Sequence, residues 1–219
     1  MKLALLLFDL DGTLVDSAPD LAGAANDLRQ AHGLPPLPFE TLRPMVGTGA
    51  RGMVGVAFGV APGHPSFDVL RDAFLARYAE RLLQDTRVFE AMLPVLDALD
   101  ARGQRWGIVT NKAMRFTQPI VAGLGLAARS AVVVAGDTTP FAKPHPEPLL
   151  EAARRAGVRP ADCAYLGDDL RDIEAGRAAG MATLAAAWGY LGQGEPVHRW
   201  GADQVLACPD QLLQSRYLT

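Results

Sequence analysis

Two aspartates separated by one residue follow a short apolar segment near the start of the chain. Residues Leu3–Phe8 are all apolar, and Asp9 and Asp11 come directly after them. On an extended backbone, side chains two residues apart point to the same side, so both carboxylates can share one small volume. Carboxylates that close repel each other unless a cation lies between them or one carries a proton. The spacing therefore predicts a metal or proton-transfer site, followed by a tight turn that Gly12 permits.

Polar side chains also follow three later apolar segments. Carboxylates from separate strands provide the oxygen ligands that Mg²⁺ prefers. A hydroxyl and a single ammonium provide donors for phosphate oxygens, and a carboxylate nucleophile beside a second carboxylate suits an aspartyl-phosphate intermediate. Together with the opening pair, these residues predict phosphoryl chemistry. They are Thr110, Asn111, Lys143, Asp168, Asp169 and Asp172.

Alternating strands and helices must position these residues. Short apolar segments alternate with helical patterns, several of which end at a glycine, as a helix C-cap does. This order is typical of βαβ units in a parallel sheet, where ligands bind beyond the carboxyl ends of the strands. The predicted strands are Leu3–Phe8, Arg105–Val109, Ala131–Val134, Ala164–Leu166, Ala182–Ala186 and Gln204–Ala207, and the predicted helices are Met92–Ala101, Arg115–Leu124, Pro146–Ala156 and Ile173–Ala179.

Residues 16–89 depart from this alternation, because they read as helix throughout with breaks at glycine and proline clusters. Within Phe67–Leu83, apolar residues spaced three to four apart mark one buried helix face. A helical stretch of this length between two strands indicates an inserted cap. We therefore expect an α/β fold with a Rossmann-like three-layer parallel-sheet core, residues 1–15 and 90–219, and an all-helical cap domain, residues 16–89.

Composition excludes several classes of protein. The 21 basic and 24 acidic residues give a net charge of −3 without a basic patch, so nucleic acid is not an expected partner. The N-terminal apolar run is too short to span a membrane and lacks a cleavage site, so a cytoplasmic protein is expected. Cys163 and Cys208 form no CxxC pair and are expected to be reduced thiols. We expect a small-molecule substrate and either a monomer or a homodimer.

Four segments resemble the four motifs of the haloacid dehalogenase superfamily in order and spacing, over nearly the whole chain. Within that superfamily, Val15–Asp20 and Thr110–Lys112 are similar to the phosphoglycolate phosphatase group, although Asp169 stands where that group often carries Ser. Other segments resemble the bacterial N-acetylmuramic acid 6-phosphate phosphatases of cell-wall recycling: Gly49–Arg51, Trp106-Gly107, Gly167–Asp172 with Ile173-Glu174, Gly189-Tyr190 and Trp200–Asp203. The four motifs are Phe8–Leu14, Val109–Lys112, Lys143-Pro144 and Gly167–Asp172.

The resemblance implies a Mg²⁺-dependent phosphomonoester phosphatase. It makes Asp9 the nucleophile, and it makes Asp11 the group that protonates the leaving alkoxide and then deprotonates the attacking water. It implies that Asp9, the backbone carbonyl of Asp11 and Asp168 bind Mg²⁺, while Asp169 and Asp172 fix these ligands. Thr110 and Lys143 would hold the phosphoryl oxygens, with further substrate contacts from Gly12, Thr13 and Asn111.

The cap would select the substrate, and its glycine-rich loop Gly47–Gly52 is the candidate for closing over the site. Arg51 in this loop offers two parallel donors to a carboxylate. Both glycolate and the lactyl group of muramic acid carry a carboxylate. The sequence therefore leaves 2-phosphoglycolate and N-acetylmuramic acid 6-phosphate as alternative substrates.

Proteins of similar architecture have other activities, and the sequence argues against some of these more strongly than against others. A dehalogenase would not need the second carboxylate, Asp11, and a phosphonate hydrolase would need a Schiff-base lysine in the cap, whereas residues 16–89 contain no lysine. A sugar phosphomutase shares the motifs and stays an alternative. A phospho-aspartate signalling domain gathers similar residues, but it needs no cap and its phosphorylated aspartate lies later in the sheet.

Overall fold

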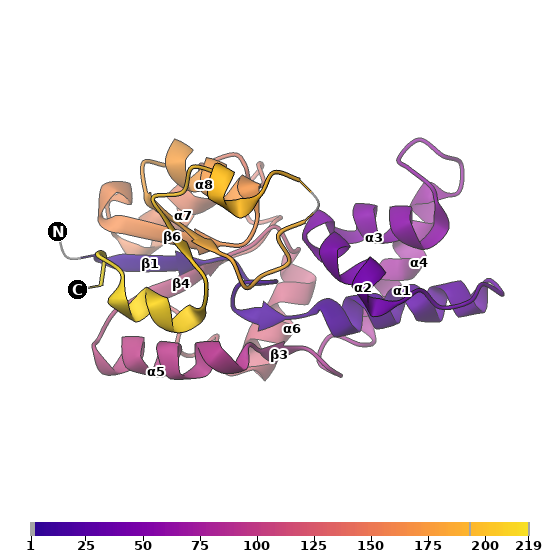
Figure 1. Cartoon of the computed structure of the whole chain (residues 1–219), viewed down its shortest axis with the longest axis horizontal. Helices are drawn as coiled ribbons and strands as arrows, with labels where there is room; N and C mark the ends of the chain where they lie inside the picture. Colours follow the sequence, from indigo (N-terminus) through magenta and orange to yellow (C-terminus); the bar gives the residue numbers. More distant parts are fainter. Residues whose placement is uncertain (1–2, 193, 219) are drawn as a thin grey trace.

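The computed structural model describes residues 3–192 and 194–218. Met1, Lys2, Gln193 and Thr219, which the sequence assigns to the core domain, lie outside the described residues. Within these ranges, a six-stranded parallel sheet lies between two layers of helices, and a group of further helices lies beyond one end of the sheet (Figure 1). The predicted fold class, with its helical insertion, is confirmed.

The sheet has the strand order β5-β4-β1-β6-β7-β8, so the first strand lies near its centre. It pairs in parallel with β4 on one side and with β6 on the other. All six predicted strands are present, and the first and third are each two residues shorter than predicted. The strands are β1 (Leu5–Phe8), β4 (Trp106–Val109), β5 (Val133–Val134), β6 (Cys163–Gly167), β7 (Ala182–Ala186) and β8 (Gln204–Leu206).

Alternate residues of β1 pack against opposite helical layers, because side chains along a strand point to alternate faces. Leu6 and Phe8 lie in a buried cluster with residues of α5 and α6, whereas Leu5 and Leu7 lie in a cluster with residues of α7 and α8. A central parallel strand is buried on both faces, which explains its uninterrupted apolar sequence. The core helices are α5 (Leu93–Ala101), α6 (Met114–Gly123), α7 (Glu147–Ala156) and α8 (Leu170–Ala178).

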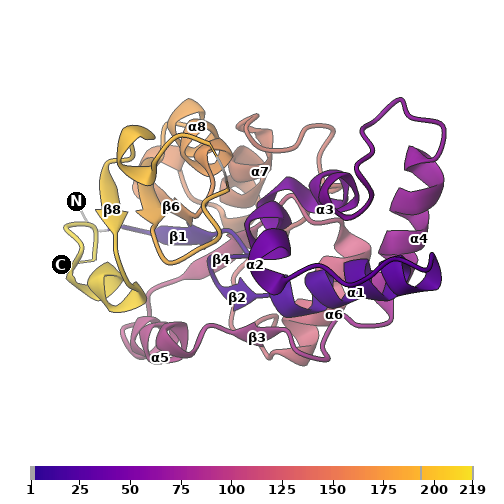
Figure 2. The ribbon, with the colours of Figure 1, turned by 45° about the vertical axis from the view of Figure 1, so that its right-hand side comes forward.

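The inserted helices have a buried cluster of their own, which also includes Phe116 and Tyr190 from the rest of the chain. Along α4, Phe67, Leu70, Phe74 and Tyr78 are buried, as the predicted apolar helix face requires. The carboxyl end of β1 points toward these helices (Figure 2). They are α1 (Ala18–Ala31), α2 (Phe39–Leu42), α3 (Gly49–Phe58) and α4 (Phe67–Ala79).

Two short antiparallel strands, β2 (Val15–Asp16) and β3 (Arg87–Val88), connect these helices to the sheet. Next to them, the buried Asp20 carboxylate accepts hydrogen bonds from the amides of Asp85 and Thr86 and from the Thr86 hydroxyl. The outgoing and returning segments are thereby tied together. Short 3₁₀ segments complete the chain at Arg43–Thr48, Glu90–Met92, Pro160–Asp162, Val197–Arg199 and Pro209–Gln214.

No helix within residues 3–192 and 194–218 combines the length and apolarity needed to cross a bilayer. Both cysteines are unpaired, as expected. Cys163 is buried and Cys208 is half-buried. Burial raises the pKa of the Cys163 thiol to about 11, so it stays protonated at neutral pH.

Candidate active site

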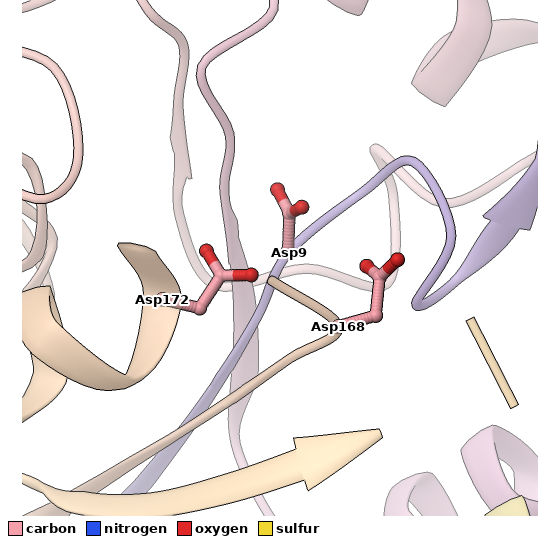
Figure 3. A group of neighbouring side chains, drawn as sticks. All are labelled: Asp9, Asp168 and Asp172. Atoms are coloured by element: carbon pink, nitrogen blue, oxygen red, sulfur yellow. The ribbon is translucent and has the colours of Figure 1, made fainter. Parts of the chain in front are cut away.

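Three carboxylates converge at the carboxyl ends of the central strands (Figure 3). Asp9 follows β1, Asp168 follows β6, and Asp172 lies in the first turn of α8. Each offers an oxygen atom, and these three atoms lie within 4.8 Å of one another. They border a cavity of about 430 Å³, whose opposite wall is formed by the inserted helices. The topology therefore brings together residues from distant parts of the sequence, as the strand-end pattern predicts.

Asp168 has no positively charged partner within the described residues. Its buried carboxylate accepts hydrogen bonds from the Thr13 hydroxyl and the Tyr190 amide, both at 2.8 Å. Burial, together with the charges of Asp9 and Asp172, raises the pKa of Asp168 well above its usual range. A buried carboxylate held by neutral donors, beside two others, fits a hard divalent cation such as Mg²⁺.

Burial also raises the pKa of Asp9, to about 7, and the charges of Asp172 and Asp11 act in the same direction. Lys143 opposes this rise, because its ammonium lies 2.9 Å from Asp9 Oδ1. One lysine therefore does not compensate the carboxylates around it, and a cation between Asp9 and Asp168 would supply the missing charge.

Lys143 is buried beneath the carboxylates. Its ammonium also lies 2.7 Å from Asp172 Oδ1 and 2.6 Å from the Tyr165 hydroxyl. Burial lowers the pKa of Lys143, but Asp172 and Asp9 outweigh it and the net direction is upward. The lysine is thus a fixed positive charge beside the Asp9 and Asp172 carboxylates.

Asn111 is exposed and holds the backbone of Lys143 in place. Its side chain donates to the Lys143 carbonyl and accepts from the Lys143 amide, both at 2.9 Å. The expected substrate contact of Asn111 stays a prediction, while its observed contacts position the lysine. Thr110 is buried at the cavity wall, and its hydroxyl accepts a hydrogen bond from the Lys112 amide at 3.1 Å.

Asp11 lies on the side of the site that faces the inserted helices. Its half-buried carboxylate accepts a hydrogen bond from the Ser17 hydroxyl and forms an ion pair with the Lys112 ammonium at 3.0 Å. The two aspartates of the opening motif therefore have different cationic partners, Lys143 for Asp9 and Lys112 for Asp11. This separation is consistent with separate chemical roles.

Gly12 and Thr13 both lie against the Asp168 carboxylate. Gly12 adopts φ +83°, and a Cβ at this position would overlap the Asp168 carboxylate. The Thr13 hydroxyl donates to that carboxylate. Neither residue is among those that line the cavity, and their predicted substrate contacts remain untested.

Asp169 caps helix α8. Its side chain accepts from the Arg171 amide, while Asp172 accepts from the Asp169 amide, so the two form a capping box. The Arg171 guanidinium donates twice to Asp169, at 2.8 Å each, and also donates to the carbonyl of Gly47 in the inserted segment. Burial pushes the pKa of Asp169 upward, but Arg171 outweighs it and the pKa is lowered.

Arg51 is exposed on α3 and is not among the residues that line the cavity. The cations that do line it are Lys112, Arg115 and Arg171. Sequence reasoning did not single out any of the three. The scarcity of lysine could have indicated Lys112, since only three of the 21 basic residues are lysines. Nothing in the local pattern indicates Arg115 or Tyr165.

Comparisons with known proteins agree with this geometry. The family model of the haloacid dehalogenase-like hydrolases matches residues 3–180. The chain is 43% identical over 213 residues to N-acetylmuramic acid 6-phosphate phosphatase of Pseudomonas aeruginosa, covering 97% of this chain and 94% of the relative. It is 45% identical over 208 residues to phosphoglycolate phosphatase of Xanthomonas campestris pv. campestris, covering 94% of this chain and 93% of the relative.

A solved structure is also similar over the whole fold. It is described as a predicted phosphoglycolate phosphatase from Haemophilus somnus 129pt. Its superposition on this chain has a TM-score of 0.86 at 28% sequence identity and covers 98% of each chain. The sequence match, the fold and the clustered carboxylates therefore lead to one conclusion. The chain belongs to the haloacid dehalogenase-like hydrolase family.

Proposed function

We propose that this chain is a Mg²⁺-dependent phosphatase that hydrolyses a small phosphomonoester through a phospho-aspartate on Asp9. The observation that carries the proposal is the cluster of Asp9, Asp168 and Asp172 at a cavity of about 430 Å³, with the buried Lys143 ion-paired to Asp9 and Asp172. The family and the names of the relatives support the same reaction class.

Asp9, Asp168 and the backbone carbonyl of Asp11 would hold Mg²⁺, whose charge would offset the repulsion between the carboxylates and the incoming phosphate. A carboxylate oxygen of Asp9 attacks phosphorus, and the bond from phosphorus to the ester oxygen breaks. Lys143, fixed between Asp9 and Asp172, stabilises the negative charge of the phosphoryl group. Thr110 offers a hydroxyl donor at the same wall.

Asp11 transfers the protons in both halves of this reaction. It donates a proton to the leaving alkoxide, and then takes one from the water that attacks the phosphorus of the phospho-aspartate. The attack releases inorganic phosphate and regenerates the Asp9 carboxylate. The contacts of Asp11 with Ser17 and Lys112 hold it on the side where the leaving group would lie.

Residues 16–89 are proposed as the cap domain that covers the site. Their helices form one wall of the cavity, and Arg171 of the core contacts the Gly47 carbonyl of the cap. Closure over this wall would exclude bulk solvent from the site and leave room for the one water that hydrolyses the phospho-aspartate. We further propose a cytoplasmic enzyme that is a monomer or a homodimer and has no nucleic-acid or membrane partner.

The cavity volume favours the larger of the two candidate substrates. 2-Phosphoglycolate is a phosphate on a two-carbon acid, whereas N-acetylmuramic acid 6-phosphate adds a hexose, an acetamido group and a lactyl ether. Pockets for drug-sized ligands span about 300–1,000 Å³, and this cavity of about 430 Å³ lies within that range. Several of its wall residues are apolar, including Leu21, Phe74 and Phe116, and could pack against a sugar ring.

A phosphomonoester panel tests the proposal. The kcat/KM with Mg²⁺ should be higher for N-acetylmuramic acid 6-phosphate than for 2-phosphoglycolate, and chelation of the metal should remove activity toward both. Asp9→Asn should be inactive toward every ester. Substantial activity of Asp9→Asn, or turnover that requires a bisphosphate primer as in a phosphomutase, would contradict the assignment.

A further inference from the structure

The Tyr78 hydroxyl is a buried polar group whose oxygen interacts with the Lys112 ammonium, while its proton has no acceptor within the described residues. Tyr78 lies on the cap helix α4, is 1% exposed and lines the cavity. Its ring is held by Phe74, at a centroid distance of 6.5 Å, and by Phe116, at 5.4 Å. Buried hydroxyls almost always have a partner. A rigidly held hydroxyl whose proton has no acceptor, in a cavity wall, therefore indicates an acceptor supplied by a ligand.

Lys112 provides a positive charge beside this tyrosine. Its ammonium lies 4.8 Å from the centroid of the Tyr78 ring and 3.0 Å from Asp11 Oδ1. Its side chain is 9% exposed and lines the same cavity. Its backbone is fixed, because its amide donates to the Thr110 hydroxyl and its carbonyl accepts from the Gly136 amide. The ammonium is thus held between the cap and the proposed proton-transfer group.

An ammonium and a tyrosine hydroxyl that lacks an acceptor both call for an acceptor on the ligand. A carboxylate is an acceptor-only group with two oxygens, and it also matches the charge of Lys112. We propose that Tyr78 and Lys112 together bind the carboxylate of the phosphomonoester, and so select acidic substrates over neutral ones. This inference rests on the phosphatase activity proposed above and adds the group that the cap recognises.

The arrangement places the two ends of the substrate. The phosphate would lie at Asp9 on the core, and the carboxylate would reach toward α4 on the cap. Arg115 also lines the cavity, but it is exposed and its guanidinium lies against the Phe116 ring at 4.6 Å, so solvent weakens its attraction for the ligand. Tyr78 and Lys112 thereby take the role that sequence reasoning gave to Arg51.

Matched substrate pairs test this proposal directly. N-acetylmuramic acid 6-phosphate is compared with N-acetylglucosamine 6-phosphate, which lacks the lactyl acid, and 2-phosphoglycolate is compared with 2-hydroxyethyl phosphate. For Tyr78→Phe, which keeps the ring, KM should rise about tenfold or more for each acidic ester, as expected for a lost hydrogen bond to a charged group. KM for each neutral ester should change less than about twofold, and kcat should change little.

Two further variants complete the experiment. Lys112→Gln should lower kcat for all four esters because Lys112 contacts Asp11, but it should also abolish the preference for the acidic member of each pair. Arg77→Gln is the matched control. It removes an exposed cation from α4, the helix that carries Tyr78, at a position that does not line the cavity. It should leave the KM values of all four esters and the preference for acidic esters unchanged.

The outcomes separate this inference from the proposed function. If the wild-type protein hydrolyses none of the esters, the phosphatase assignment itself fails. If the wild type is active but Tyr78→Phe changes KM equally for acidic and neutral esters, or changes neither, the carboxylate assignment alone is overturned. It is also overturned if Arg51→Ala, rather than Tyr78→Phe, removes the preference.

Discussion

Replacing Asp9 with asparagine should stabilise the metal-free protein at alkaline pH while abolishing activity. Burial raises the pKa of Asp9 to about 7 in the fold, whereas its ordinary value is 3.8. Because the folded state holds the proton more tightly than the unfolded state, its contribution to stability is fully present below pH 4. That contribution is lost as the pH rises toward 7. Asparagine is uncharged at every pH and escapes this loss.

The pKa difference sets the size of the effect. A rise from 3.8 to about 7 is about 3 pH units, and each unit corresponds to about 1.4 kcal/mol, so the upper limit is about 4 kcal/mol. Asparagine also removes one partner of Lys143, although Lys143 keeps its ion pair with Asp172. We therefore expect the variant to be more stable than the wild type by about 2 to 4 kcal/mol at alkaline pH. For a chain of this size that corresponds to a rise in Tm of roughly 4–16 °C.

Thermal unfolding in a chelator, at pH 4 and at pH 8, measures the difference. At pH 4 the Asp9 side chain is protonated in the folded wild type and partly protonated in the unfolded chain, so the variant and the wild type should have similar Tm values; at pH 8 the variant should unfold at the higher temperature. Added Mg²⁺ should raise the Tm of the wild type more than that of the variant at pH 8. A Tm difference that does not depend on pH, or a variant that is less stable at pH 8, would refute the reasoning.

Three further substitutions test the supports of the site. Gly12→Ala should prevent Mg²⁺ binding and lower kcat/KM at least a hundredfold (~2.7 kcal/mol), because its Cβ would overlap the Asp168 carboxylate and φ is +83°; isothermal titration with Mg²⁺ measures this, and unchanged binding would contradict it. Lys143→Met should destabilise the fold by about 3 kcal/mol or more and remove turnover, because Asp9 and Asp172 lose their shared cation; denaturant unfolding gives the free energy, and a neutral effect would count against the charge argument. Asn111→Ala should lower kcat about tenfold or more with a smaller change in KM, because it frees the Lys143 backbone; a change confined to KM would instead indicate direct substrate contact.

The fold was predictable because it follows from local patterns in the sequence. Apolar segments of strand length alternate with helices that end at glycine, and a long helical stretch interrupts them once. Asp9 and Asp168 were predictable for the same reason, since each directly follows a strand of a parallel sheet. Because β1 and β6 are neighbours in the sheet, the strand order alone brings these two carboxylates together.

The wall of the cavity that faces the cap was not predictable in this way. Tyr78 occupies one more apolar position on an amphipathic helix, and only the packing shows that its hydroxyl lies beside Lys112 and lacks an acceptor. Arg51 attracted attention because the sequence predicts a glycine-rich loop there, but the residue lies on helix α3 and is exposed. Asp169 lies in an acidic cluster, and its side chain caps α8 by accepting a hydrogen bond from the Arg171 amide. For Tyr78, contacts with side chains from distant segments decide the role, and no spacing along the chain encodes them.

The central claim is that Asp9 attacks phosphorus and becomes phosphorylated. Rapid acid quenching of the enzyme during turnover of a ³²P-labelled phosphomonoester, followed by peptide mapping, tests it most directly. We expect an acyl phosphate that hydroxylamine releases and that maps to Asp9, with the labelled enzyme accumulating further in Asp11→Asn if that variant retains the first step. Continued turnover without a covalent phosphoenzyme, or with the label on another residue, would contradict it.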